Sequence, residues 1–136
     1  MAAPSFELKE YQQAALYRFR SYLRDAEGEG ANVAFYKATN LPYRDAPVIA
    51  DGTPYICLRI PTGGGKTVMG AHAVGIAAQE FLKVPNPMVL WLVPSTPILE
   101  QTVSALKNPR HPYRAALTKD FGRNVSVLTR VEALAI

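Results

Sequence analysis

The sequence has one cysteine and no long apolar run, and each shortage excludes a class of protein. A single cysteine, Cys57, cannot form an internal disulfide or a multi-cysteine zinc site. Within the apolar stretch YICLRI it is expected to be buried and inert. The longest uninterrupted apolar run, Met88 to Val93, is far shorter than the roughly 20 residues that cross a bilayer. The first residues lack the basic start and apolar core of a signal peptide, so a cytoplasmic location is expected.

The net charge is also low, at +4 for the 136 residues. With 49% hydrophobic and 19% charged residues, the composition suits one globular domain with a real core. The charges of residues 1–106 cancel, whereas residues 107–130 hold six Lys or Arg against Asp120 alone. This basic tract is either a solvated loop or a source of contacts to the phosphates of a polyanion.

An amphipathic helix is predicted near the start of the chain. Apolar residues recur at three- and four-residue steps from Leu8 to Ala26, which is the spacing of one helix face. Ser5 can cap this helix, and the sequence EGEG stops it. Residues 31–54 mix short β-type runs with Asn, Pro and Gly, so they are expected to form an irregular connection with room for a short hairpin.

The sequence IPTGGGKT, residues 60–67, lies between a predicted strand and a predicted helix. Residues 55–60 are rich in β formers, and residues 66–83 are apolar enough for a largely buried helix. Strand, glycine loop and helix is the order of a P-loop, in which backbone N–H groups turn inward around a phosphate. The alternative is a chance glycine-rich turn. The general P-loop pattern has glycine where Ile60 stands, whereas the closing Gly-Lys-Thr matches.

Two more strands are predicted in the second half of the chain. Residues 88–93, MVLWLV, suit a strand covered on both faces, as in a parallel sheet. Thr96 then caps a helix with Pro97 in its first turn, and this helix runs to about Leu106. Residues 124–129, NVSVLT, are a candidate third strand. The sequence therefore predicts an α/β fold, an open layer of parallel strands with flanking helices.

A phosphate cradle would assign a role to each residue of the glycine stretch. Gly63, Gly64 and Gly65 let the backbone approach the phosphates closely, because they carry no side chain. The Lys66 ammonium is expected to reach the β- and γ-phosphates, and the Thr67 hydroxyl to occupy one position on Mg²⁺.

Two other groups of polar residues have both a ligand-binding and a plain structural interpretation. The amide of Gln12 can donate to and accept from an adenine edge. It can equally be one more polar residue on the exposed side of a helix, and Gln13 competes for the role. Ser95 and Thr96 ahead of Pro97 form a helix cap. Free N–H groups and hydroxyls at that helix start also suit the phosphates of a nucleic-acid backbone.

Three stretches resemble motifs of the superfamily 2 helicases and translocases, in the order in which that family has them. PTGGGKT resembles motif I, in which the first glycine is commonly replaced. LKEYQQAA resembles the LRxYQ start of helicase-like ATPases such as the type III restriction Res subunit. VLWLVPSTPILEQ resembles motif Ia, VPTxxLxxQ, with Pro94, Ser95, Thr96, Leu99 and Gln101 in register.

The resemblance implies ATP and Mg²⁺ as cofactors and DNA as a partner. The implied nucleotide-binding residues are Gln12, Thr62, Gly63, Gly64, Gly65, Lys66 and Thr67, with Lys66 and Thr67 catalytic and Thr67 on the metal. The implied nucleic-acid-binding residues are Pro94, Ser95, Thr96 and Gln101. The implied fold is that of a P-loop NTPase (RecA-like) with an open parallel sheet, of which residues 1–136 would be the N-terminal part.

One element of the family is absent from the sequence. ATP hydrolysis in such enzymes needs an acidic strand end, Asp-Glu, that holds Mg²⁺ and orients the attacking water. No Asp-Glu pair occurs in these 136 residues. The second, C-terminal motor domain of the family is missing too. We therefore expect an incomplete motor, a fragment or truncated product that binds ATP weakly and hydrolyses it poorly. The alternatives are a small-molecule P-loop kinase and a non-catalytic nucleotide or nucleic-acid binding module.

Overall fold

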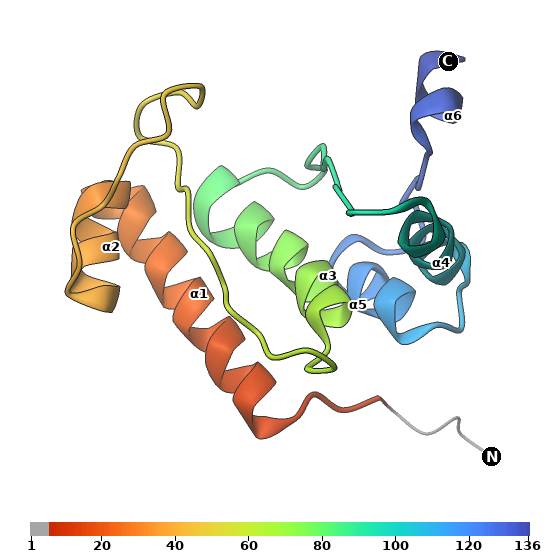
Figure 1. The fold of residues 1–136 in the computed structure, drawn as a ribbon, viewed down its shortest axis with the longest axis horizontal. Helices are drawn as coiled ribbons and strands as arrows, with labels where there is room; N and C mark the ends of the chain where they lie inside the picture. Colours follow the sequence, from red (N-terminus) through yellow and green to blue (C-terminus); the bar gives the residue numbers. More distant parts are fainter. Residues whose placement is uncertain (1–5) are drawn as a thin grey trace.

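The computed structural model describes residues 6–136, and all regular secondary structure within them is helical (Figure 1). The elements are α1 (Glu10–Glu29), α2 (Ala31–Thr39), α3 (Lys66–Ala77), η1 (Ala78–Leu82), α4 (Thr96–Lys107), α5 (Pro112–Phe121) and α6 (Arg130–Leu134). Helix α3 continues without a break into η1, a wider π-helical turn. Helix α6 projects away from the other helices (Figure 1), and a 3.0 Å hydrogen bond from Lys107 to Glu132 joins it to α4.

The predicted α/β fold with its open parallel sheet is wrong, because residues 6–136 contain no β-strand. The segments predicted as strands, residues 55–60, 88–93 and 124–129, run as non-helical chain between the helices. A strand exists only where its backbone N–H and C=O groups pair with a second strand. An apolar run specifies side-chain directions and says nothing about that partner, which is why the prediction failed.

The side-chain alternation that suggested strands is still present in these segments. Leu90 and Leu92 are 83% and 80% exposed, whereas Trp91 between them packs against α3. Val125 and Val127 likewise pack against the buried residues of α3, α4 and α5, with an exposed residue between them. Non-helical chain that alternates in this way covers the helices with one face only.

Gly30 separates α1 from α2 by turning the chain sharply. Its φ of 96° lies in a region that side chains rarely adopt. The turn lets α2 pack back on α1, so that Ala31 and Ala34 are 2% and 0% exposed. The predicted irregular connection, residues 31–54, therefore begins with a helix, and only the part after Thr39 is irregular.

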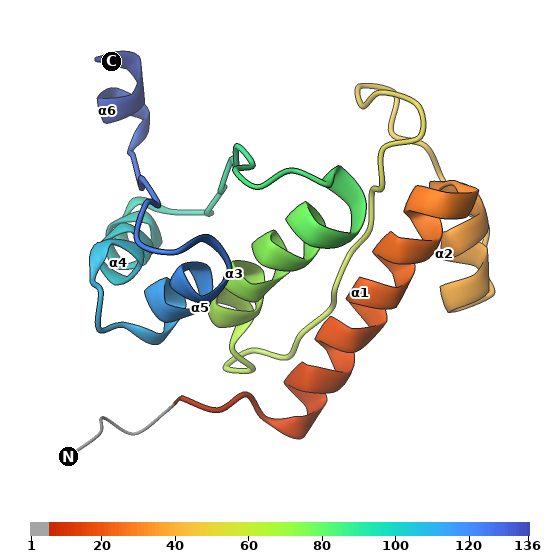
Figure 2. The same cartoon turned by 180° about the vertical axis from the view of Figure 1, so that it is seen from behind.

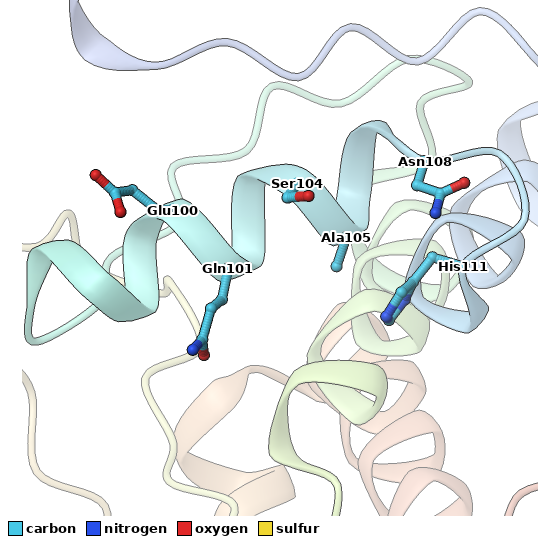
Figure 3. A pocket seen from close by; sticks show the side chains of 6 residues that line it. All are labelled: Glu100, Gln101, Ser104, Ala105, Asn108 and His111. Atoms are coloured by element: carbon cyan, nitrogen blue, oxygen red, sulfur yellow. The ribbon is translucent and has the colours of Figure 1, made fainter.

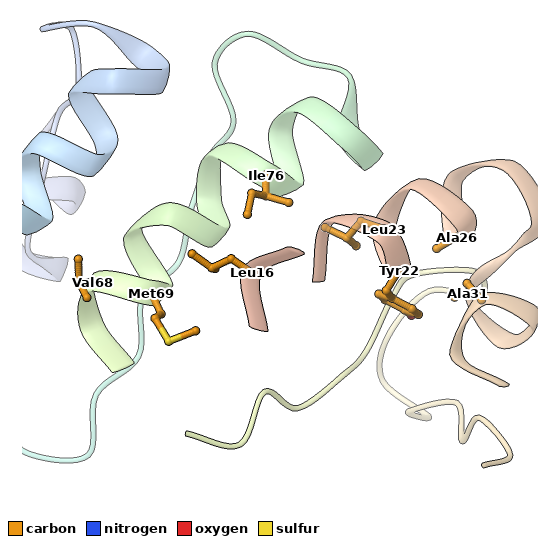
Figure 4. Packing of buried hydrophobic residues seen from close by; sticks show 9 residues of the cluster. Leu16, Tyr22, Leu23, Ala26, Ala31, Val68, Met69 and Ile76 are labelled. Carbon is orange, nitrogen blue, oxygen red and sulfur yellow. The ribbon is translucent and has the colours of Figure 1, made fainter. Parts of the chain in front are cut away.

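Helix α3 lies between two groups of packed helices (Figures 1 and 2). The first cluster joins α3 to α1 and α2 (Figure 4) and consists of Leu16, Tyr22, Leu23, Ala26, Ala31, Ala34, Val68, Met69 and Ile76. The second cluster joins α3 to α4 and α5 and consists of Ala71, Leu106, Ala116 and Leu117. Because α3 buries opposite faces, it is apolar nearly all round, as the sequence indicated.

The two glycines within α3 are explained by close packing. Glycine weakens a helix by about 1 kcal/mol relative to alanine. A Cβ at Gly70 would lie 2.9 Å from the Trp91 ring, and one at Gly75 would collide with the carboxylate of Asp120 on α5. These glycines therefore let a ring and a neighbouring helix approach the backbone of α3.

An ion-pair group fastens α1 to η1 outside these clusters. Arg24 Nε lies 3.2 Å from a carboxylate oxygen of Glu80, and Arg20 donates a shorter bond to the same carboxylate. The hydrogen bonds from Arg24 and Arg20, aided by their charges, lower the pKa of Glu80 from 4.5 to about 2.

Acid is expected to weaken this attachment between pH 4.5 and about 2. The folded chain holds Glu80 ionised more strongly than the unfolded chain does, so the carboxylate stabilises the fold above pH 4.5. That contribution falls as the pH drops through the folded pKa. Glu80→Gln should therefore unfold at lower urea than wild type at neutral pH, and the two proteins should converge near pH 2. A difference in midpoint that stays constant with pH would contradict this assignment.

Two local predictions need correction and one lies outside the described residues. Cys57 is exposed rather than buried, because its segment lies over the helices on one side only. The N-cap of α4 is Ser95 rather than Thr96. The predicted cap Ser5 falls outside residues 6–136, and α1 begins at Glu10 after the N-cap Lys9.

Candidate nucleotide-binding site

The glycine loop, residues 61–65, is a tight turn that ends where α3 begins. Gly64 N–H donates to the Pro61 carbonyl at 2.8 Å. Gly63 and Gly65 have φ of 75° and 84°, in the left-handed region that favours glycine. The Gly65 carbonyl then accepts a helical hydrogen bond from Met69 N–H at 3.0 Å. The loop and helix start predicted from IPTGGGKT are therefore present, although no strand precedes them.

Steric space also requires glycine at two of these positions, Gly64 and Gly65. A Cβ at Gly64 would lie 2.7 Å from Ile60 Cγ2 and 2.7 Å from the Pro61 carbonyl oxygen. A Cβ at Gly65 would collide with the Gln12 side-chain amide. Ile60, which departs from the general P-loop pattern, thus packs directly under the loop.

Helix α1 holds this loop through two adjacent side chains. Gln12 Nε2 and the Tyr11 hydroxyl each donate to the Gly64 carbonyl oxygen at 2.8 Å. Gln12 is only 4% exposed, and its Oε1 accepts a 2.8 Å bond from Lys9 N–H. Gln12 is therefore a buried residue at the glycine loop and not a polar residue on an exposed face. Gln13, the competing candidate, is exposed and bonds to the backbone just before α1.

Lys66 and Thr67 are the first two residues of α3. The first N–H groups of a helix have no helical acceptor and form its positive end, which attracts an anion. Lys66 is exposed at this end, Thr67 is half-buried, and Thr62 is exposed on the approach to the turn. The structure therefore gathers residues 62–67 and Gln12 at one place.

The loop offers few oxygen ligands of its own for Mg²⁺. Thr67 contributes a hydroxyl, and no group of three or more His, Cys, Asp or Glu side chains gathers within residues 6–136. Mg²⁺ keeps several waters and is commonly bound by one or two protein oxygens together with substrate phosphates. These residues therefore suit Mg²⁺ that is already bound to a nucleotide better than they suit free Mg²⁺.

The residues predicted to contact nucleic acid lie at the start of α4. Ser95 is the N-cap, Pro94 precedes it and Thr96 is the first helical residue; all three are exposed. The Ser95 side chain forms no capping bond to the first turn. Among the described residues, no hydrogen bond joins this group to the glycine loop.

Gln101 lies in an open depression of about 400 Å³ farther along α4 (Figure 3). The depression is lined by Glu100, Gln101, Ser104, Ala105, Asn108 and His111. His111 also caps α5, because its Nδ1 accepts a 3.2 Å bond from Tyr113 N–H. The carboxylate of Glu100 would repel a phosphate, so this depression suits a neutral hydrogen-bonding group better than a nucleic-acid backbone.

Part of the basic tract forms a second concave site, of about 410 Å³. Its lining consists of Pro109, Arg114, Thr118 and Arg123. The Arg114 guanidinium is held in place by 3.2 Å bonds to the carbonyls of Leu106 and Arg123. The tract is therefore not a wholly solvated loop, because α5 orders its middle portion.

Sequence reasoning missed the contact of Tyr11 with the loop. Tyr11 fits the apolar stripe of the first helix, yet it is 43% exposed and bonded through its hydroxyl to Gly64. The available signal was its position beside Gln12 in the stretch KEYQ.

Comparison with known proteins gives one match. The family described as "Type III restriction enzyme, res subunit" matches residues 5–130. Searches of curated proteins and of solved structures found no match. Among the described residues, no helix is both long and apolar enough to span a membrane.

Proposed function

The chain belongs to the type III restriction enzyme Res subunit family, and on that premise we propose that it is the ATP-binding segment of an ATP-dependent DNA helicase or translocase. The family implies a helicase-like, ATP-dependent function in general. The observation that supports this segment's part is the glycine loop at the start of α3, fixed to α1 through Gln12.

Each loop residue has a role in this proposal. Backbone amides at the start of α3 surround the phosphates, and the Lys66 ammonium neutralises charge on the β- and γ-phosphates. The Thr67 hydroxyl contributes one ligand to Mg²⁺, which neutralises further phosphate charge when bound. Gln12 reads the adenine edge, and because it is only 4% exposed its amide must first turn away from the Gly64 carbonyl. Because Gly64 N–H is bonded within the turn, it takes no part in the cradle.

Nucleotide binding by this chain should depend on Lys66. Lys66→Ala is expected to weaken binding of a fluorescent ATP analogue at least about tenfold, the usual loss for one charged hydrogen bond. Titration by fluorescence anisotropy measures the effect. Lys119→Ala removes an exposed lysine of α5 and is the matched control, expected to bind like wild type. Equal affinities for wild type and Lys66→Ala would contradict the proposal.

Turnover is expected to be slow or absent despite this binding. The sequence has no Asp-Glu pair to hold Mg²⁺ and orient the attacking water. In this proposal the acidic pair belongs to another part of the motor, as the second motor domain does. Steady-state phosphate release should therefore stay near background. Turnover typical of a motor enzyme, abolished by Lys66→Ala, would contradict this part of the proposal.

DNA binding is proposed for the start of α4 and the basic tract. Contacts to phosphates release counterions, so affinity for labelled DNA should fall steeply as salt increases. Arg123→Ala should reduce the slope of log affinity against log salt by about one, whereas Arg18→Ala on α1 should leave it unchanged. A slope near zero would contradict DNA binding. ATP turnover stimulated by a small acceptor and not by DNA would favour a small-molecule kinase.

A further inference from the structure

The Gly64 carbonyl accepts two hydrogen bonds, and both come from α1. Tyr11 and Gln12 lie 53 and 52 positions away in the sequence, and each places a donor 2.8 Å from this oxygen. A carbonyl oxygen has two lone pairs, so its acceptor capacity is filled. A single donor already satisfies a buried carbonyl. The second donor is therefore more than the fold requires.

The two bonds also fix the direction of the next amide. A trans peptide is planar, so the C=O of Gly64 and the N–H of Gly65 point in opposite directions. No cis peptide occurs among the described residues. Because the carbonyl points at α1, the Gly65 N–H points away from α1. A phosphate cradle needs its amides held in such a fixed direction.

Gln12 cannot reach a base from its position in this structure. Its Nε2 donates one bond to Gly64 and its Oε1 accepts one from Lys9 N–H, and each atom keeps one unused bonding position. Because only 4% of the residue is exposed, a base can meet these positions only after the side chain turns away from the Gly64 carbonyl. If Gln12 were the single donor, its release would leave a buried carbonyl unpaired, and the glycine turn would lose its anchor. The Tyr11 hydroxyl removes that difficulty, because it stays on the carbonyl when Gln12 leaves.

We propose that Tyr11 is a positioning residue of the nucleotide site, whose hydroxyl holds the Gly64 carbonyl while Gln12 turns to the adenine base. This inference rests on the proposed nucleotide-binding function. Tyr11 keeps the loop in its binding conformation, and Gln12 is thereby free to discriminate between bases. Base selectivity thus depends on a residue that does not contact the base.

The test uses Tyr11→Phe, Gln12→Ala and the double variant with three ligands: ATP, GTP and inorganic tripolyphosphate, each with Mg²⁺. Tripolyphosphate has no base and reports the loop alone. Each single variant should bind it within about threefold of wild type, because one donor remains, and the double variant at least about tenfold more weakly. Tyr11→Phe should also lower the preference for ATP over GTP by about tenfold, although Gln12 is intact, because the amide then stays on Gly64.

Two outcomes would overturn the role of Tyr11. One is a wild-type ATP preference in Tyr11→Phe, and the other is an equal loss for all three ligands, which a merely structural residue would give. Tyr17→Phe removes a hydroxyl from the same helix, where the residue is 71% exposed, and should change nothing.

Hydrogen exchange without ligand separates this inference from the proposed function. The amides of Gly64 and Met69, which are bonded to the carbonyls of Pro61 and Gly65, should exchange faster than wild type in the double variant and near the wild-type rate in each single variant. Wild-type exchange in the double variant would overturn the holding role. Equal ATP binding by wild type and Lys66→Ala would overturn the proposed function, and the base-reading role with it.

Discussion

Replacing Gly65 with alanine is expected to weaken nucleotide binding, because a changed φ at Gly65 redirects the amides at the start of α3, and to lower the free energy of unfolding by about 2 kcal/mol. The φ of 84° at this position strains any side chain by roughly 1–2 kcal/mol. The new Cβ would also collide with the Gln12 amide, which would have to leave the Gly64 carbonyl. Urea unfolding and titration with a fluorescent ATP analogue measure the two effects.

Two other glycines separate the causes of this effect. Gly52 has a φ of 80° but open space around it, so Gly52→Ala reports backbone strain alone. Gly28 has open space within α1 and no positive φ, so Gly28→Ala should be neutral or slightly stabilising. We expect only the change at Gly65 to impair nucleotide binding. A Gly65→Ala protein as stable and as tightly binding as wild type would contradict the loop geometry.

Leu23→Ala is expected to have the largest effect on stability, about 2–4 kcal/mol. Leu23 is 4% exposed in the cluster between α1 and α3, and its loss would leave a cavity there (Figure 4). Urea unfolding followed by circular dichroism measures the change. Leu41→Ala, at a leucine 59% exposed after α2, removes the same atoms and should stay within about 0.5 kcal/mol of wild type. A loss in Leu23→Ala as small as the one expected for Leu41→Ala would contradict the role of the cluster in stabilising the fold.

Helices with a periodic pattern and clear end signals were predictable. The apolar spacing up to Ala26, the continuous apolar stretch after Lys66 and the Ser-Thr-Pro start at Ser95 each correspond to a helix. Helix α2 was missed because its short pattern is interrupted by Asn and Lys, and its burial comes from packing on α1. The strands were wrong for a different reason. A strand forms only when a second segment pairs with it through backbone hydrogen bonds, and the sequence of one segment does not show whether such a partner exists.

In the candidate site, too, features set by neighbouring residues were predictable, and contacts between distant parts of the chain were not. Residues 62–67 are consecutive, so their turn and helix start follow from local chemistry. The bonds from Tyr11 and Gln12 to Gly64 join parts of the chain that no periodicity relates. Gln12 was placed by resemblance to a family motif. The concave site at Arg114 and Arg123 could be anticipated only as an excess of positive charge.

The position of α3 between two sets of helices has a consequence for how the molecule melts. Neither cluster is complete without this helix, since it supplies Met69 and Ile76 to one and Ala71 to the other. Loss of α3 would therefore disrupt both clusters together, and we expect the chain to unfold as one cooperative unit when heated. An anion bound at the first turn of α3 would raise the melting temperature of the entire assembly of helices, including those it never touches.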